Sequence, residues 1–210
     1  FTVGYGMTEC APLISYSPWR RFKRTSAGRC LKNIMEVKIL QDNTLSSASE
    51  HRQGEIMVRG LNVTKGYYKN PEATAALLDE DGWLHTGDMG WVGDDNRTIY
   101  IRGRYKTMIL SANGQNIYPE EIEAKLSNMP YVSECLVVER DGRLVAICHP
   151  DNDEVTRDNL TDSQLIEAME ANRKSLNKIV ASYEQVSAIE ILPEEFEKTP
   201  KRSIRRFLYK

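Results

Sequence analysis

The feature that most constrains the fold is a change of hydrophobic pattern near Gly103. Before that glycine, short stretches of alternating apolar and polar residues lie between glycines and polar turns, which is typical of β-strands. After it, helical and strand patterns follow one another in the order of a small α+β domain. We therefore predict an α+β chain, with a β-rich domain over residues 1–102 and a compact α+β domain over residues 103–210.

The β-rich part contains clear strand patterns and one helical pattern. Residues 35–39, 54–60 and 98–101 alternate in polarity or are rich in β-branched residues, and they predict strands. A helix is predicted over residues 71–78, because Asn70 can cap it, a proline suits its first position and alanine-rich sequence follows.

The second part is predicted to fold in the order β-α-β-β-α-β. The dipeptides Asn113-Gly114 and Asp141-Gly142 mark tight turns between its elements. The predicted strands cover residues 108–110, 132–139, 144–149 and 186–192, and the predicted helices cover residues 119–126 and 162–181.

Charge and hydropathy exclude several classes of protein. The 210 residues include 28 Lys+Arg and 30 Asp+Glu, which gives a net charge of −2, and the hydrophobic share is 40%. These values exclude a collagen-like or disordered chain, and they argue against a nucleic-acid partner, which normally needs a broad basic surface. No apolar run reaches the roughly 18–20 residues of a membrane span, so we expect no transmembrane segment. Peripheral membrane contact stays open.

Cysteine use indicates a reducing compartment. Cys10, Cys30, Cys135 and Cys148 form no C-x-x-C pair and are too sparse for a disulfide framework. The histidines do not supply zinc spacing either. We expect free thiols in or near the core of a cytoplasmic protein. The chain begins without a methionine or a secretory signal, and we expect it to be part of a longer protein.

Short segments along the chain carry residues suited to nucleotide chemistry. Thr8 offers a hydroxyl to a phosphate oxygen, and Glu9 is a hard oxygen ligand suited to Mg²⁺. Asp88 can accept both hydroxyls of a ribose, and Arg104 offers a fork of donors to ribose or phosphate oxygens. Taken singly, each has an ordinary structural explanation: a turn that closes a strand, a loop cap or a surface salt bridge.

The C-terminal segment is strongly basic. Residues 198–210 contain six basic side chains. Such a segment suits a phosphate, RNA or an anionic membrane, and it is equally typical of a solvated C-terminus.

The order and spacing of these segments resemble the adenylate-forming superfamily, which includes acyl-CoA synthetases, peptide-synthetase adenylation domains and luciferases. The resemblance runs over essentially the whole chain. The matching segments are Tyr5-Gly6-Met7-Thr8-Glu9, residues 54–60 with Gly66-Tyr67-Tyr68, residues 70–74, residues 82–88, Gly103-Arg104-Tyr105-Lys106 and residues 113–123. The wording Asn-Ile-Tyr-Pro-Glu-Glu-Ile-Glu in the last segment is most similar to fatty acyl-CoA ligases.

The resemblance implies a reaction and its cofactors. Enzymes of the family join a carboxylic acid to ATP, release pyrophosphate and pass the acyl group from the acyl-adenylate to a thiol, usually CoA. ATP, Mg²⁺ and CoA are therefore the implied cofactors, with a fatty acid as substrate. Residues 1–102 would be the end of the large domain, and residues 103–210 the small mobile lid domain.

The resemblance also assigns roles near the N-terminus of the chain. Thr8 would contact the ATP phosphates and Glu9 would hold Mg²⁺. Tyr5 and Gly6 would lie near the adenine and the acyl carboxylate.

Further along the chain, Asp88 and Arg104 would hold the ribose. Lys106 would be the hinge of the lid domain. Gly114 would line the thiol channel, where a pantetheine arm needs close backbone approach.

One position departs from the family pattern. The family carries a lysine in a T-P-x-x-K segment near its C-terminus, and Ser203 occupies that position here. A serine carries no charge and cannot offset the negative charge that develops at the phosphate. We expect Lys201 or Arg202 to substitute in part.

A glycine-rich phosphate loop with its lysine is not found in the 210 residues. We therefore expect the C-terminal part of a long-chain fatty acid–CoA ligase that is inactive when isolated. The alternatives are a peptide-synthetase adenylation domain or an acyl–carrier-protein synthetase. An alternative of another class is a catalytically impaired binding or scaffold module, which Ser203 favours.

Overall fold

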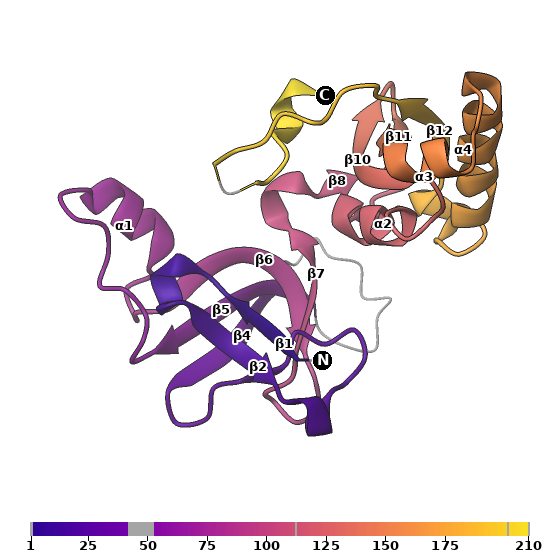
Figure 1. Cartoon of the computed structure of the whole chain (residues 1–210). Coiled ribbons are helices and arrows are strands. Elements are labelled where there is room, and N and C mark those ends of the chain that lie inside the picture. The colour runs from indigo at the N-terminus through magenta and orange to yellow at the C-terminus, as the bar shows by residue number, and fades with distance from the viewer. Residues whose placement is uncertain (1, 42–52, 112, 201, 210) are drawn as a thin grey trace. The chain divides into compact units, whose positions relative to one another are not determined.

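The chain divides into two units between Lys106 and Thr107. The computed structural model describes residues 2–41, 53–111, 113–200 and 202–209. It divides into a first unit, Phe1–Lys106, and a second unit, Thr107–Lys210, each with its own hydrophobic core (Figure 1). The mixed helix and strand content confirms the predicted α+β class.

The first unit consists mainly of antiparallel sheets with the strand orders β1-β2-β3 and β4-β5-β6-β7. Its elements are β1 Val3–Gly6, β2 Leu13–Ser17, β3 Arg29–Cys30, β4 Met35–Gln41, β5 Gly54–Gly60, α1 Pro71–Leu77, β6 Leu84–Val92 and β7 Ile99–Arg104. The strands predicted over residues 35–39, 54–60 and 98–101 are confirmed as β4, β5 and β7.

Apolar residues from several strands form the core of the first unit. Ile14, Ile56, Val58, Leu84 and Ile99 are fully buried and belong to one cluster. Their burial explains why the alternation in the sequence was a reliable signal, since one side of each strand has to leave water.

Helix α1 begins as its sequence predicts. The Asn70 side chain accepts a hydrogen bond from the backbone N–H of Ala73 at 3.0 Å, which satisfies one of the free donors of the first turn. The proline follows at the first helical position, where no donor is needed.

The second unit contains a sheet with the order β10-β11-β12 and a short hairpin, β8-β9. Strand β11 is antiparallel to β10 and parallel to β12. The elements are β8 Ile109–Leu110, β9 Asn116–Ile117, α2 Pro119–Leu126, β10 Val132–Arg140, β11 Arg143–Pro150, α3 Asn152–Arg157, α4 Asp162–Leu176 and β12 Val186–Ile191.

Both faces of the β10-β11-β12 sheet are covered. Cys135 and Val137 point into a cluster with residues of α2 and α4. Leu136 and Val138, which alternate with them along β10, pack in a second cluster with Phe196 from the C-terminal segment. The sheet is therefore the middle of three layers, and the C-terminal segment is an outer layer rather than a loose end.

Several predicted boundaries differ from the structure. Helix α4 ends at Leu176 instead of residue 181, because the Asn177 side chain bonds both the backbone N–H and the carbonyl of Val186 at 2.9 Å. Helix α3 was not predicted; Asp151 caps it by accepting from the N–H groups of Asp153 and Glu154. Strand β6, which carries Asp88, was not predicted. The predicted polar turn over residues 41–53 lies mostly outside the described residues.

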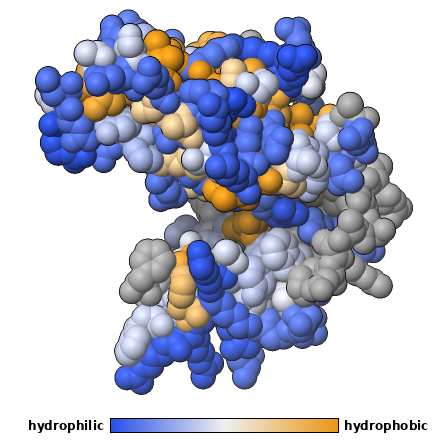
Figure 2. Space-filling view, turned by 90° about the vertical axis from the view of Figure 1, so that its right-hand side faces the viewer, coloured by the Kyte–Doolittle hydropathy of each residue, from blue (hydrophilic) through white to orange (hydrophobic). Residues whose placement is uncertain are grey.

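One face of the surface can be judged from its hydropathy. On the face drawn in Figure 2, hydrophilic residues predominate and hydrophobic residues occur in small groups among them. Among the described residues, no helix combines the length and the apolar character needed to cross a bilayer. All four cysteines are free and buried, as predicted.

Candidate functional site

Tyr5, Asp88 and Arg104 meet in the first unit. Asp88 and Arg104 are direct partners across strands β6 and β7, and Arg104 Nε lies 2.8 Å from Asp88 Oδ1. The Tyr5 hydroxyl donates to Asp88 Oδ2 at 2.7 Å from strand β1. The Asp88 side chain is 9% exposed, whereas the Arg104 side chain is 59% exposed. A held carboxylate and an accessible guanidinium thus lie side by side.

A bulge in β6 positions Asp88. The register of β5 and β6 shifts between Glu55 and Met57, and Gly87 in the bulge has a φ of +70°, a conformation that glycine adopts without strain. Glu55 holds the bulge: its Oε1 accepts from the Gly87 N–H at 2.9 Å, and its Oε2 lies 2.8 Å from His85 Nδ1. His85 therefore supports the strand.

The Thr86 hydroxyl adds a second anchor for Asp88. Thr86 Oγ1 donates to the Ile56 carbonyl at 2.7 Å and accepts from the Asp88 N–H at 3.1 Å. Because Thr86 is buried, these bonds are shielded from water and fix the strand at the point where Asp88 leaves it.

Tyr5 remains a proton donor over the ordinary pH range. Burial, followed by the nearby Asp88 charge, raises the pKa of Tyr5 well above its usual value. The next strand residue, Gly6, leaves no room for a side chain, since an added Cβ would lie 1.9 Å from the Pro12 carbonyl oxygen. Close approach of the β1–β2 connection is therefore the structural reason for a glycine there.

Glu9 lies at a second polar position of the first unit. The Tyr67 hydroxyl donates to Glu9 Oε1 at 2.7 Å, and this bond raises the pKa of Tyr67. The Glu9 carbonyl accepts from the Thr64 N–H at 2.8 Å. Thr8, the residue before it, is exposed and begins the short 3₁₀ turn Thr8–Cys10. A hydroxyl and a carboxylate are thus presented on one turn.

Donor chemistry at these positions suits a nucleotide with its cation. An ionised carboxylate accepts hydrogen bonds at both of its oxygens, so Asp88 has the chemistry that suits the hydroxyl groups of a sugar. Glu9 keeps an oxygen for a hard cation. Within the described ranges no group of three or more His, Cys, Asp and Glu side chains forms a metal cage. A cation held by one carboxylate and by substrate oxygens needs no such cage.

Other predicted residues lie at the junction or in the second unit. Lys106 is exposed and is the last residue of the first unit. Gly114 lies at the turn of the β8–β9 hairpin, where its N–H donates to the Ser111 carbonyl at 2.9 Å. A Cβ added to Gly114 would meet nothing within 4 Å. The described residues therefore leave space beside Gly114, and its approach by a pantetheine arm stays a prediction.

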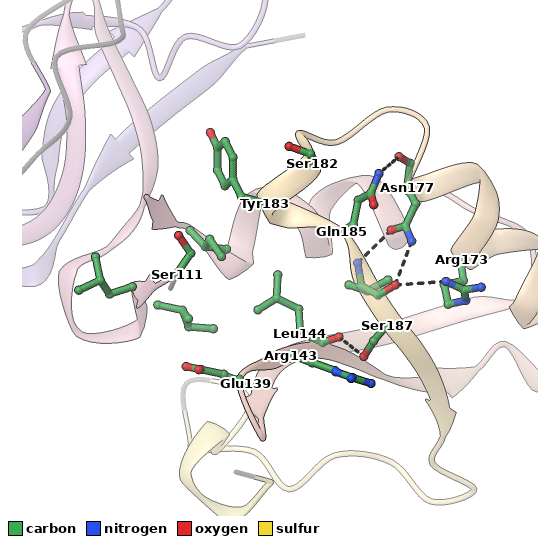
Figure 3. A pocket seen from close by; sticks show the side chains of 15 residues that line it. Ser111, Glu139, Arg143, Leu144, Arg173, Asn177, Ser182, Tyr183, Gln185 and Ser187 are labelled. Carbon is green, nitrogen blue, oxygen red and sulfur yellow. Dashed lines mark hydrogen bonds between the residues drawn. The ribbon is translucent and has the colours of Figure 1, made fainter. Parts of the chain in front are cut away.

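A cavity of about 560 Å³ lies in the second unit beside the β8–β9 hairpin (Figure 3). Many of its polar groups already bond to one another. Asn177 binds the Val186 backbone, and the Ser187 hydroxyl donates to the Leu144 carbonyl at 2.8 Å. None of the predicted site residues is among the described residues that line it. We therefore interpret it as a packing feature of the second unit.

Ser203, at the position of the expected lysine, is exposed in a tight turn. The turn is closed by the Thr199 N–H, which donates to the Ser203 carbonyl at 2.8 Å. Arg202 in this turn has a φ of +61°. Lys201, the other predicted substitute, lies outside the described residues.

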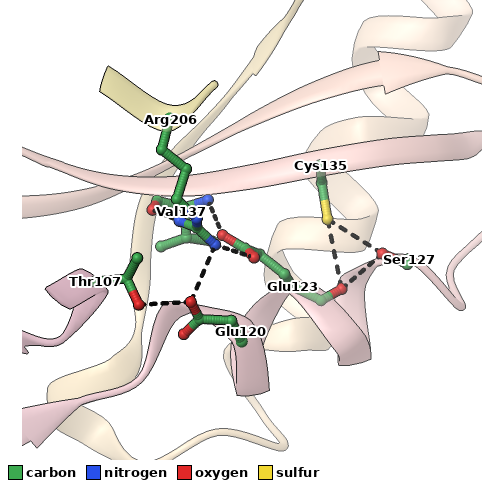
Figure 4. A network of polar contacts seen from close by, with 7 residues as sticks. All are labelled: Thr107, Glu120, Glu123, Ser127, Cys135, Val137 and Arg206. Carbon is green, nitrogen blue, oxygen red and sulfur yellow. Dashed lines mark hydrogen bonds and ion pairs between the residues drawn. The ribbon is translucent and has the colours of Figure 1, made fainter. Parts of the chain in front are cut away.

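Arg206 attaches the C-terminal segment to helix α2 (Figure 4). Its guanidinium bonds the Glu123 carboxylate, lies 3.6 Å from Glu120 Oε1 and donates to the Val137 carbonyl. Burial raises the pKa of Glu123, although Arg206 lowers it in part.

Two more basic residues of the tail have acidic partners. Lys198 lies 2.9 Å from Glu134, and Arg205 lies 3.6 Å from Glu197. Much of the basic tail is therefore engaged within the second unit rather than offered to a polyanion.

Sequence reasoning missed Glu55, Tyr67 and Thr86, which support the predicted residues. All of them lie inside the segments that carry the family resemblance, next to the glycines noted there. A polar residue beside a glycine inside a strand pattern was the available signal, since such glycines often mark bulges.

Known proteins resemble this chain along almost its whole length. The 4-coumarate-CoA ligase 1 of Narcissus pseudonarcissus is 34% identical over 215 residues, covering 97% of this chain and 36% of that protein. The 4-coumarate–CoA ligase 4 of Arabidopsis thaliana is 36% identical over 203 residues, covering 92% of this chain and 34% of that protein. The chain thus spans about a third of the length of these curated relatives.

A solved structure has the same fold. The o-succinylbenzoate CoA synthetase MenE of Bacillus subtilis, in complex with its acyl-adenylate intermediate OSB-AMP, superposes with a TM-score of 0.77 at 27% identity. The match covers 100% of this chain and 40% of that protein.

Family comparison gives the same result for each part of the chain. Residues 1–68 match the family described as AMP-binding enzyme, and residues 106–209 match the AMP-binding enzyme C-terminal domain. Both family models match in order along the chain, and the fold is that of a solved member. This chain therefore belongs to the superfamily of adenylate-forming, AMP-binding enzymes.

Proposed function

We propose that this chain is the C-terminal part of an ATP-dependent acid–thiol ligase that activates a carboxylic acid as an acyl-adenylate and transfers it to CoA. The observation that carries the proposal is the Tyr5–Asp88–Arg104 cluster, in which a nearly buried carboxylate is held between a phenol and an accessible guanidinium. The similarity to 4-coumarate-CoA ligases and to MenE supports it.

In this proposal Asp88 accepts the two ribose hydroxyls of ATP. Tyr5 and Arg104 hold one Asp88 oxygen each, so the carboxylate is fixed in place, and a carboxylate is the acceptor that ribose hydroxyls require. Arg104 adds donors to the same sugar or to a phosphate. Tyr5 and Gly6 lie near the adenine and the acyl carboxylate.

Thr8 and Glu9 serve the phosphate end of the nucleotide. Thr8 donates its hydroxyl to a phosphate oxygen, and Glu9 supplies an oxygen ligand to the Mg²⁺ that accompanies ATP. When bound, Mg²⁺ offsets the negative charge that builds on the α-phosphate as the carboxylate attacks. Tyr67 keeps Glu9 oriented through their hydrogen bond.

The class of acid is a finer part of the proposal. The wording of residues 116–123 favours a long-chain fatty acid. The names of the relatives, 4-coumarate-CoA ligase and o-succinylbenzoate CoA synthetase, describe aromatic acids instead. A panel of fatty and aromatic acids, assayed for AMP release with CoA by the full-length enzyme, decides between them.

The remaining parts of the proposal concern the second unit and the compartment. We propose that residues 103–210 are the lid domain, that Lys106 is its hinge and that Gly114 lines the thiol channel. Ser203 occupies the position of the family's lysine, so Lys201 or Arg202 offsets part of the negative charge that develops at the phosphate. Free cysteines and the lack of disulfide spacing support a cytoplasmic location.

Substitution of Tyr5 by phenylalanine tests the nucleotide site. Tyr5→Phe removes the hydrogen bond to a carboxylate, and such bonds contribute about 1.5–3 kcal/mol, so the KM for ATP should rise about tenfold or more. Tyr16→Phe, in the neighbouring strand β2 and partly exposed, is the matched control and should leave this KM unchanged. Equal KM values for ATP in the two variants and the parent contradict the proposal.

The isolated 210-residue chain should not form an acyl-adenylate. It lacks a glycine-rich phosphate loop and spans about a third of the length of its relatives. Carboxylate-dependent exchange of pyrophosphate into ATP, measured on this chain alone, should be absent, and exchange above background would refute this part of the proposal.

A further inference from the structure

An acid-free basic segment follows strand β2. Between Glu9 and Glu36 the sequence contains six basic residues and no acidic one, although the whole chain has a net charge of −2. Four of the six lie in the run Trp19-Arg20-Arg21-Phe22-Lys23-Arg24. This run, which we call the basic aromatic loop, is drawn in indigo after β2 in Figure 1.

Every residue of the basic aromatic loop is exposed. The aromatic side chains of Trp19 and Phe22 are 66% and 43% exposed, and they lie in the same short run as the four cations. The four cations cannot leave water without acidic partners, so the loop has to remain at the surface. Arg20 stacks over the Trp19 ring at 4.8 Å from its centre, which keeps charge and aromatic surface together.

A short 3₁₀ turn separates Trp19 and Phe22 by three positions. The turn covers Trp19–Arg21, and Phe22 is its C-terminal cap. Side chains three residues apart eclipse one another in a 3₁₀ helix, so Trp19 and Phe22 share one edge while Arg20 and Arg21 flank them. Hydrogen bonds from residues on either side hold the backbone of the loop. The Ser17 hydroxyl donates to the Arg21 carbonyl, and the Ser26 hydroxyl donates to the Lys23 carbonyl.

Acidic side chains near the basic aromatic loop do not neutralise most of its positive charge. Asp95, in the turn before β7, is bonded to Thr98 and lies 3.3 Å from Arg29, which is outside the loop. The charge of Lys23 helps to lower the pKa of Asp95, although the two side chains form no close ion pair. Within the described part of the chain, Arg20, Arg21 and Arg24 form no ion pair with an acidic side chain.

We infer that the basic aromatic loop docks the protein onto an anionic lipid surface. Its cations complement lipid phosphates and carboxylates, and Trp and Phe rings suit the interface between headgroups and acyl chains. A nucleic acid is the less favoured partner, because the chain has a pI of about 6.0 and lacks a broad basic footprint. The inference does not depend on the proposed ligase activity.

Sedimentation with vesicles tests the inference on the 210-residue chain. The chain should bind vesicles of phosphatidylcholine mixed with phosphatidylserine, should bind vesicles of phosphatidylcholine alone much less, and should be released by salt. Each basic residue near an anionic membrane multiplies binding about fivefold, so Arg20→Glu with Arg21→Glu should weaken it about 25-fold or more. Trp19→Ser with Phe22→Ser should also weaken it, and in the parent the Trp19 fluorescence should shift to the blue.

Matched controls come from another exposed stretch of the same unit. Lys65→Glu with Lys69→Glu makes the same charge change at exposed positions, and Leu61→Ser with Tyr68→Ser removes residues that are each 88% exposed. Both control variants should bind like the parent. Equal losses in the controls, equal binding to neutral vesicles, or tighter binding to a single-stranded oligonucleotide than to the anionic vesicles would each overturn the inference. Circular dichroism verifies that all variants are folded.

Discussion

At the scale of single residues, this protein uses carboxylates as anchors for backbone and side-chain donors. Glu55 holds the bulge that carries Asp88, and Glu123 holds both Arg206 and the Val137 N–H. Asp95 does the same in the turn before β7, where it accepts from the N–H groups of Arg97 and Thr98 and from the Thr98 hydroxyl. Each of these carboxylates fixes a segment that sequence patterns describe only as a turn or a strand end.

Asp95 should make the stability of the first unit sensitive to acid. Partial burial alone would raise its pKa, but hydrogen bonds from Thr98 and Arg97 lower the pKa to about 2. A lowered pKa stabilises the folded state above the unfolded-state pKa of about 4, and this stabilisation is lost as the pH falls towards 2. Allowing for solvent screening, the loss is about 1 kcal/mol.

The measurement is the free energy of unfolding of the parent and of Asp95→Asn between pH 5 and pH 2. The difference between the two proteins should shrink as the pH falls. Asp81→Asn, in an exposed turn of the same unit, is the control and should differ from the parent by a constant amount. A difference for Asp95→Asn that is independent of pH contradicts the assignment.

At the scale of elements, one face of the second unit's sheet is covered by the C-terminal segment, whose only helix among the described residues is the short 3₁₀ turn Arg206–Leu208. Phe196 and the partly buried Ile204 and Tyr209 cover the face of β10 and β11 that is opposite to the helices. Arg206 then links this segment to helix α2. Phe196 packs on the sheet before the turn that carries Ser203, and Ile204 and Tyr209 pack on it after the turn. Together with the Arg206–Glu123 ion pair, these contacts hold the turn in place.

Arg206→Met should destabilise the second unit strongly. The Arg206 and Glu123 side chains are 22% and 14% exposed, and removal of one partner of a buried pair costs about 3–5 kcal/mol. Because burial already raises the pKa of Glu123, the unpaired carboxyl will take up a proton in acid. The loss should therefore be larger at pH 8 than at pH 5.

Urea unfolding at both pH values checks this prediction. Arg205→Met is the matched control, since its pair with Glu197 is exposed and should contribute less than about 1 kcal/mol. The double variant Arg206→Met with Glu123→Met should recover part of the lost stability. Equal effects of Arg205→Met and Arg206→Met would show that the Glu123 pair is not a buried anchor.

At the scale of the whole molecule, the chain consists of units that each bury their own core. The first unit depends on antiparallel sheets around Ile14, Ile56 and Leu84, and the second on helices packed on the β10-β11-β12 sheet. Their division follows Lys106, next to the glycine at which the sequence pattern changes. A self-contained core on each side is what independent folding requires.

Calorimetry of the 210-residue chain should therefore show two unfolding transitions. Each unit has about 105 residues, and at about 0.7 kcal/mol per residue each transition should have an enthalpy of about 70 kcal/mol. Arg206→Met should lower the temperature of one transition and leave the other in place. A single transition that moves as a whole in this variant would contradict independent units.

The sequence by itself determined the α+β class, the strands and helices with strong periodicity and the cap of α1. These features depend on local spacing, which is complete within a short stretch of chain. The segment 82–88 shows the limit of such signals: no bulged strand was predicted there, because the bulge depends on Glu55 of the neighbouring strand.

Tertiary structure alone decided which of these residues meet. Tyr5 and Asp88 are separated by 83 positions, Glu9 and Tyr67 by 58, and Glu123 and Arg206 by 83. No periodicity reaches over such distances, since the register between strands and the path of the C-terminal segment follow from the packing of buried side chains. For that reason the family resemblance could assign Asp88 and Arg104 to one ribose, whereas the phenol that holds Asp88 and the anchor of the Ser203 turn became visible only in the folded chain.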